Sequence, residues 1–100
     1  MQLPRSVKLR VEYALSRTAD LRTGRLQADP RWLTCIEETY ASLTDVKRVF
    51  FRDFFIRHLS NDEILYNHYI EHTTLYAWRD EIYTAVALRA AVCGLIRVIE

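Results

Sequence analysis

Residues 68–72 contain two histidines and a glutamate at the spacing of a zinc-binding motif. His68, Glu71 and His72 form the pattern H-x-x-E-H, which is the signature of the inverted zinc proteases. On an unbroken helix the two imidazoles could share one metal ion, and the glutamate could activate a bound water. Such a site needs a third protein ligand, and the glutamates that follow have no supporting pattern. We therefore expect no metal, no cofactor, no catalytic residue and no enzymatic activity.

The same residues also fit a helix, a turn and the start of a second helix. In a helix-turn-helix a short helix is followed by a turn of three or four residues and by a helix that enters the major groove. This interpretation assigns residues 59–83 to a helix-turn-helix. Five apolar side chains would pack its two helices and its turn: Ile64, Leu65, Ile70, Leu75 and Trp78. The two interpretations exclude each other, because the zinc pair requires one helix from His68 to His72.

The outward positions at the start of the second helix are the candidate DNA-contacting residues. Four of them would face the edges of bases: His72, Thr73, Tyr76 and Ala77. Thr74 and Arg79 would face phosphates. Between Ser60 and Tyr83, Arg79 is the one lysine or arginine, against five acidic residues. Because DNA affinity comes largely from neutralised phosphates, basic residues from elsewhere must contribute.

Two segments could supply this positive charge. The formal net charge is +1, but residues 1–31 carry seven lysines and arginines against three acidic residues. We predict a basic N-terminal helix or arm over residues 1–28, which either meets a polyanion or forms a solvated helix face. The second source is the helix expected at residues 46–58, which carries Lys47, Arg48, Arg52 and Arg57. Of these, Lys47 and Arg48 are the predicted DNA-binding residues.

Composition predicts one all-α domain over residues 1–100. Half of the residues are hydrophobic, and with 2 glycines and 2 prolines long helices are more plausible than many short strands. Asp29 and Pro30 can start one helix, and Ser60 with Glu63 can form a capping box at another. We expect a five-helix bundle with a C-terminal helix-turn-helix and a long last helix. The expected helices cover residues 6–21, 30–43, 46–58, 61–69 and 73 onward.

The cysteines and the chain termini predict a cytoplasmic protein. Cys35 and Cys93 each stand alone in an apolar segment and are expected to be reduced core thiols. No signal peptide is expected, since residues 1–10 are charged where an apolar core would lie. The apolar run 85–99 contains two arginines and is too short to span a bilayer. Its part 92–99 would form either a homodimer interface or a surface buried against the first helix.

Three stretches of the chain resemble a known family. In "TLYAWRDEIYTAVALRAA" (74–91) and the threonine before it, eight residues match the family pattern: Thr73, Thr74, Leu75, Tyr76, Trp78, Arg79, Glu81 and Ile82. "IEETYASL" (36–43) and "VEYAL" (11–15) resemble two upstream helices. The chain thus resembles the RinA/ArpU-type phage transcriptional regulators, which are similar to the promoter-reading fourth region of bacterial sigma factors. Tyr69 and Glu71 differ from the family, which has other residues at the turn and at the cap.

The resemblance implies a regulator of phage or prophage late genes for packaging or lysis. Its partners would be double-stranded DNA and the RNA polymerase of the bacterial host. The alternative is a non-enzymatic helical module of phage origin, an oligomerising adaptor or packaging accessory that turns its acidic face to another protein. The regulator hypothesis requires the backbone to turn between Tyr69 and Thr73. The helix boundary there is therefore the first structural question.

Overall fold

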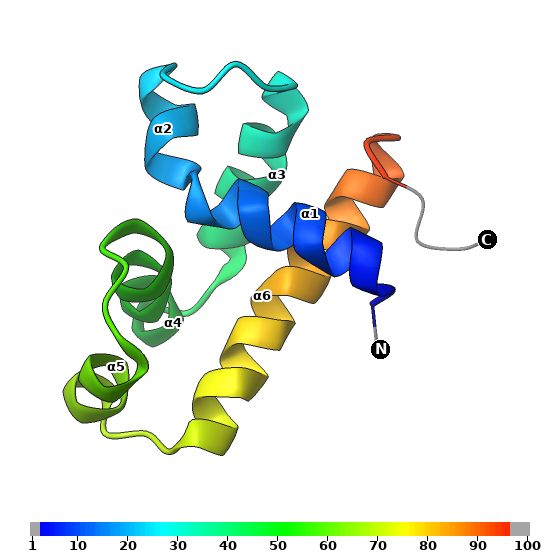
Figure 1. Ribbon diagram of the computed structural model, residues 1–100. Helices are drawn as coiled ribbons and strands as arrows, with labels where there is room; N and C mark the ends of the chain where they lie inside the picture. The colour runs from blue at the N-terminus through cyan, green and yellow to red at the C-terminus, as the bar shows by residue number, and fades with distance from the viewer. Residues whose placement is uncertain (1–2, 97–100) are drawn as a thin grey trace.

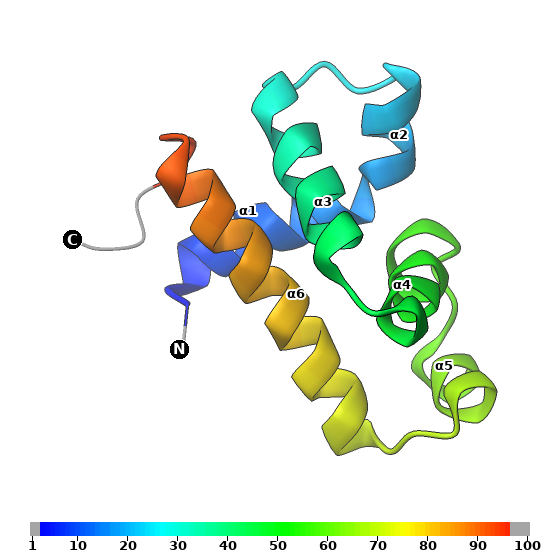
Figure 2. The ribbon, with the colours of Figure 1, turned by 180° about the vertical axis from the view of Figure 1, so that it is seen from behind.

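The computed structural model describes residues 3–96, and within that range the chain is entirely helical, as predicted. It contains six α-helices and one π-helical segment rather than five helices (Figures 1 and 2). Their bounds are α1 Arg5–Ser16, α2 Thr18–Thr23, α3 Pro30–Ser42, α4 Asp45–Phe51, η1 Arg52–Ile56, α5 Asn61–His68 and α6 His72–Val92. The long helix α6 is the centre of the fold: α1 crosses one side of its C-terminal half and α3 packs on the other.

The first predicted helix is split in two at Arg17. This residue leaves helical geometry (φ −108°, ψ 17°), and its N–H donates to the carbonyl oxygen of Ala14 at 3.1 Å. The hydroxyl of the next residue, Thr18, is fully buried and donates to the carbonyl oxygen of Leu15 at 2.7 Å. The buried hydroxyl thus satisfies a carbonyl at the break. α2 then ends at Gly24, whose left-handed φ of 74° costs a glycine little.

The third predicted helix changes its winding at Arg52. The N–H of Arg57 donates to the carbonyl oxygen of Arg52 at 2.8 Å, which spans five residues rather than four. This wider turn lets Phe50, Phe51 and Phe55 all lie in the core, with at most 3% of each exposed. In a regular α-helix Phe51 and Phe55 would share a face, but Phe50 would lie about 140° from Phe55. The segment ends at Ile56, and two residues later His58 has a φ of +53°.

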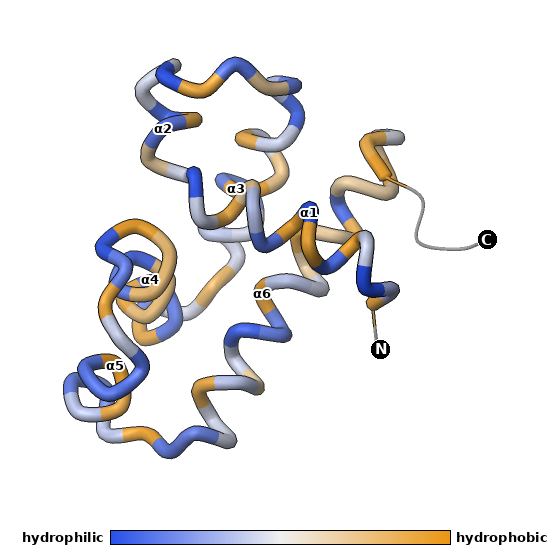
Figure 3. The backbone as a smooth tube through the Cα atoms, viewed as in Figure 1, coloured by the Kyte–Doolittle hydropathy of each residue, from blue (hydrophilic) through white to orange (hydrophobic). Residues whose placement is uncertain are grey.

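The core is one continuous cluster around α6. The buried apolar side chains of α6 belong to one cluster with those of α1, α3, α4, η1 and α5. The tube in Figure 3 alternates between apolar and polar residues along α1 and α6. The contributors from α6 are Leu75, Ile82, Tyr83, Val86, Ala87 and Ala90. Of the apolar run 92–99, Val92 is exposed and Ile96 is buried, while 97–99 lie outside the described residues.

Two helix starts follow the predicted caps. The Asp29 carboxylate accepts the N–H of Arg31 at 2.9 Å and opens α3, with Pro30 at the first position. Hydrogen bonds from the Arg31 side chain and backbone hold the pKa of Asp29 down at about 2. At α5 the Ser60 hydroxyl accepts the N–H of Glu63, and the Glu63 carboxylate accepts the N–H of Ser60, each at 3.2 Å. Both are local signals that the sequence displays directly.

Candidate functional site

The chain turns between α5 and α6 over three residues, Tyr69, Ile70 and Glu71. Tyr69 adopts the left-handed conformation (φ 53°, ψ 44°) with its side chain almost fully exposed. The N–H of Ile70 donates to the carbonyl oxygen of Leu65 at 3.3 Å, which closes the end of α5. The alternative of one unbroken helix from His68 to His72 is therefore wrong.

This turn separates the two histidines of the H-x-x-E-H pattern. His68 ends α5, with only 7% of its side chain exposed, and its Nε2 lies 2.9 Å from Oδ2 of Asp53 in η1. His72 begins α6 at the surface, where its ring stacks on that of Tyr76. Among residues 3–96 no three histidine, cysteine, aspartate or glutamate side chains are grouped to hold a metal ion. The two histidines therefore do not lie on one helix, as the zinc interpretation requires.

The first two turns of α6 present a small exposed face. The four residues predicted to face base edges, His72, Thr73, Tyr76 and Ala77, are all exposed there, while Thr74 is half-buried. Behind this face Leu75 is fully buried, and the half-buried Trp78 places its ring edge-on to Phe50 with centroids 5.4 Å apart. The inner residues thus fix which side of α6 faces outward.

Arg79 lies back along α6 rather than reaching out from it. Its Nε and Nη2 atoms are 3.1 and 2.9 Å from Oδ1 of Asp80, and its guanidinium stacks over the ring of Tyr76. The guanidinium also lies 5.5 Å from the ring of Tyr83, and burial raises the pKa of that tyrosine. Only 22% of the Arg79 side chain is exposed. A phosphate would have to displace Asp80 to reach this cation.

The two basic residues expected to help from α4 are also engaged. Lys47 reaches α6, where its Nζ lies 2.8 Å from Oε2 of Glu81. Arg48 turns to the end of α3 and donates to the carbonyl oxygens of Tyr40 and Ala41 at 3.2 and 2.7 Å. Lys47 therefore contacts α6 at Glu81, more than two turns after its start. Arg48 contacts the end of α3 instead of α6.

The N-terminal basic segment forms α1 and α2 as part of the folded domain. Within it, Arg22 pairs with Glu37 at 2.6 Å and Arg17 with Asp20 at 3.7 Å. The guanidinium of Arg10 stacks over the ring of Trp32 at 5.8 Å. Of the seven lysines and arginines in residues 1–31, three are thus paired with carboxylates at the surface: Arg17, Arg22 and Arg31. Helix α1 packs against α6, so this segment is not a free arm.

A cluster that sequence reasoning missed lies beside the turn. Asp53, with 6% of its surface exposed, binds His68 through one carboxylate oxygen and Arg57 through the other, at 3.0 Å. The Arg57 side chain is 63% exposed. The sequence could have predicted the pair of Asp53 and Arg57, because they are four residues apart on one helix. No sequence pattern predicts that His68 joins them. Asp53 thus links the Arg57 guanidinium to His68, the last residue of α5.

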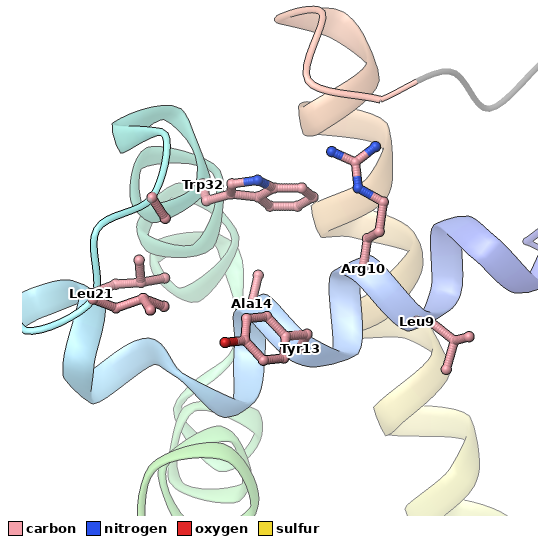
Figure 4. Close-up of a pocket in the computed structure, with 8 residues that line it drawn as sticks. Leu9, Arg10, Tyr13, Ala14, Leu21 and Trp32 are labelled. Atoms are coloured by element: carbon pink, nitrogen blue, oxygen red, sulfur yellow. The ribbon is translucent and has the colours of Figure 1, made fainter.

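A second surface feature is a pocket between α1, α2 and the start of α3. It is an apolar pocket of about 320 Å³. Figure 4 shows its lining residues, with the Arg10 guanidinium beside the Trp32 indole. Leu9 and Tyr13 line it and are each more than half exposed. Arg10 is the charged side chain among its lining residues, which are otherwise apolar or aromatic.

Comparison with protein-family models, curated proteins and solved structures finds no match for this chain. The resemblance to the RinA/ArpU-type regulators therefore rests on the residues quoted for it alone. Within residues 3–96 no helix has the length and apolar character needed to cross a membrane.

Tyr69 offers a direct test of the turn geometry. Changing Tyr69 to glycine is expected to raise the free energy of unfolding by about 0.5–1 kcal/mol, because a side chain in the left-handed region costs energy that glycine avoids. The matched control is Tyr66→Gly, an exposed position inside α5 where the same change should cost about 1 kcal/mol. Urea denaturation measures both. Equal losses in the two variants would mean that α5 continues through Tyr69.

Proposed function

We propose that this protein is a sequence-specific DNA-binding regulator of phage or prophage origin, in which α5, the turn and α6 act as a helix-turn-helix. The observation that supports it is the three-residue turn at 69–71, which starts α6 with His72, Thr73, Tyr76 and Ala77 on one exposed face. These are the positions that a recognition helix turns toward base edges. The resemblance adds host RNA polymerase as a partner and the host cytoplasm as the place of action.

The chemistry of this face suits reading bases in the major groove. A threonine hydroxyl donates and accepts, so Thr73 can pair with either kind of base edge, and the methyl group of Ala77 suits the thymine methyl. No side chain caps the start of α6. Its first backbone N–H groups can therefore donate to a phosphate oxygen, at the positive end of the helix dipole.

Electrostatics limit the affinity that this interface can reach. Five acidic residues lie between Ser60 and Tyr83, and three cations on the helices around the turn, Lys47, Arg57 and Arg79, are each paired with a carboxylate. We expect about two phosphates to be neutralised, by Arg57 and by an Arg79 released from Asp80. The logarithm of the binding constant should then fall with the logarithm of salt concentration with a slope of about −2.

Selection of the purified protein against a random duplex library tests the proposal. One enriched sequence is expected, and Arg79→Ala should weaken binding to it about tenfold and reduce the salt slope by about one. The matched control is Arg25→Ala, which removes the same charge from the exposed loop after α2. Fluorescence anisotropy measures both variants. Absence of an enriched sequence at low salt, or equal losses in the two variants, would contradict DNA binding.

The acidic surface around the turn favours a second candidate, a helical protein-interaction module. Tyr66, Tyr69 and Tyr76 are exposed there by 79%, 91% and 40%, and tyrosine is enriched in protein interfaces. A basic protein surface would complement the acidic residues between them. Tyr69→Gly separates the two functions, since it keeps the turn and removes the most exposed ring. Unchanged DNA affinity is expected from a regulator, whereas an interaction module would lose affinity for its protein partner.

A further inference from the structure

Two cysteines that are 58 residues apart in the chain meet where α3 packs against the end of α6. Cys35 lies in the middle of α3 and is buried, and Cys93 follows the last residue of α6 and is half-buried. Their Sγ atoms are 3.9 Å apart, and both thiols are free. Neither sequence segment predicts this meeting, because neither cysteine has a neighbour at a recognisable spacing.

The surrounding fold holds the two sulfurs in place. Nη1 of Arg31 on α3 donates to the carbonyl oxygen of Cys93 at 2.7 Å, and Arg31 is itself fixed by Asp29 at 2.6 Å. Nη2 of Arg10 on α1 donates to the carbonyl oxygen of Leu95 at 3.3 Å. The chain just after α6 is thus tied to two other helices, so the thiol pair is a persistent feature of the fold.

The distance is short enough for a covalent bond after a small movement. A disulfide requires sulfurs about 2.05 Å apart, so the two atoms must approach by about 1.9 Å. Cys93 can supply much of this movement. It is the C-cap residue of α6, where its N–H still donates to the carbonyl oxygen of Arg89 at 3.2 Å, and it is followed by Gly94 with a φ of 84°.

The pair is also open to small reagents. A surface pocket of about 310 Å³ is lined by both cysteines and by Arg31 and Arg89. Glu38 lines the same pocket, so one carboxylate lies beside these two guanidinium groups. Burial raises the pKa of Cys35 to about 11, with its contact to Cys93 adding to the effect. The more exposed Cys93 is therefore the sulfur that an oxidant meets first, and Cys35 is placed to react second.

We propose that Cys35 and Cys93 form a reversible intramolecular disulfide on reaction with a hydroperoxide. The Cys93 thiolate attacks one oxygen of hydrogen peroxide, which breaks the O–O bond, releases hydroxide and leaves a sulfenic acid on Cys93. The Cys35 sulfur then attacks the sulfenic sulfur, and the hydroxyl group leaves with the Cys35 proton as water. Overall two thiols and one peroxide give one disulfide and two waters. An external dithiol reverses the reaction by exchange.

The product would staple α3 to the C-terminal end of α6. Helix α6 has 21 residues, so its last turn lies about 30 Å from His72 at its start. The disulfide would close a long loop and stabilise the folded chain without touching the exposed face at the turn. This proposal therefore does not depend on DNA binding and can be tested without DNA.

Oxidation of the full chain with an equimolar amount of hydrogen peroxide tests the proposal. The protein should lose the mass of two hydrogen atoms while remaining a single chain. Tryptic peptides 32–47 and 90–97 should be joined, and dithiothreitol should separate them. The melting temperature of the oxidised protein should rise by about 10 °C relative to the reduced protein.

Two comparisons make the result specific to the folded geometry. Cys35→Ser and Cys93→Ser should each abolish the joined peptides, with circular dichroism confirming that the variants fold. The wild-type chain should form the bond at least about tenfold faster when folded than in guanidinium chloride, since the fold brings the sulfurs together. Equal rates in the two states, or disulfides between chains or sulfonic acids in place of the internal bond, would overturn the proposal.

Discussion

Replacing Phe50 by alanine is expected to lower the free energy of unfolding by about 3–5 kcal/mol, a large part of the stability of a domain this size. Phe50 lies on α4 and is fully buried. Its ring centroid is 5.4 Å from that of Trp78 on α6 and 6.0 Å from that of His68 on α5, both edge-on. One side chain therefore holds both helices that flank the turn, and alanine would leave a cavity between them.

Guanidinium denaturation followed by fluorescence measures this loss, and Val46→Ala on the same helix is the control. Val46 is 59% exposed, so its truncation should change stability by no more than about 0.5 kcal/mol. The contact with Trp78 adds a local readout, since a cavity beside its indole should alter the tryptophan emission of the folded state. Similar losses for the two variants would mean that Phe50 does not anchor the turn.

Features specified by neighbouring residues could be predicted from the sequence. Asp29 followed by Pro30 begins α3, and the reciprocal bonds of Ser60 and Glu63 begin α5, because a cap needs only residues within one turn. Helical spacing likewise identified the exposed side of α6 at Thr73 and Tyr76. These signals are local, and the fold agrees with them.

Features that depend on packing could not be predicted in this way. The π-helical segment lies where Phe50, Phe51 and Phe55 are buried together, and a local helix pattern does not predict it. The break at Arg17 depends on the burial of the Thr18 hydroxyl. Apolar spacing in residues 6–21 continues across that break, so periodicity alone reads one helix.

The charges of the candidate site show the same limit. Lys47 and Glu81 are 34 residues apart and meet only because α4 packs near α6. Arg79 faces phosphates if helix geometry alone is considered, yet it lies against Asp80, Tyr76 and Tyr83. Counting cations along the sequence therefore overestimates the positive charge that this surface can offer to DNA.

Asp53→Ala is expected to destabilise the protein by about 2–4 kcal/mol, because it leaves the buried His68 ring without a hydrogen-bond partner. Asp53 connects η1 to the last residue of α5 through a 2.9 Å contact. The ion pair with Arg57 adds little to this effect, since the arginine side chain is 63% exposed and solvent screens it. The carboxylate therefore acts mainly by fixing His68, and with it the start of the turn.

A double-mutant cycle between Asp53→Ala and His68→Ala, measured by urea denaturation, tests this assignment. A coupling energy of about 1–3 kcal/mol is expected, whereas a cycle between Asp53→Ala and Arg57→Ala should give less than about 1 kcal/mol. Hydrogen exchange should also become faster at the amides of Tyr69 and Ile70 in Asp53→Ala. If the Arg57 cycle gives the larger coupling, the buried carboxylate serves the surface arginine, and the position of the turn depends on the aromatic contacts of Phe50 instead.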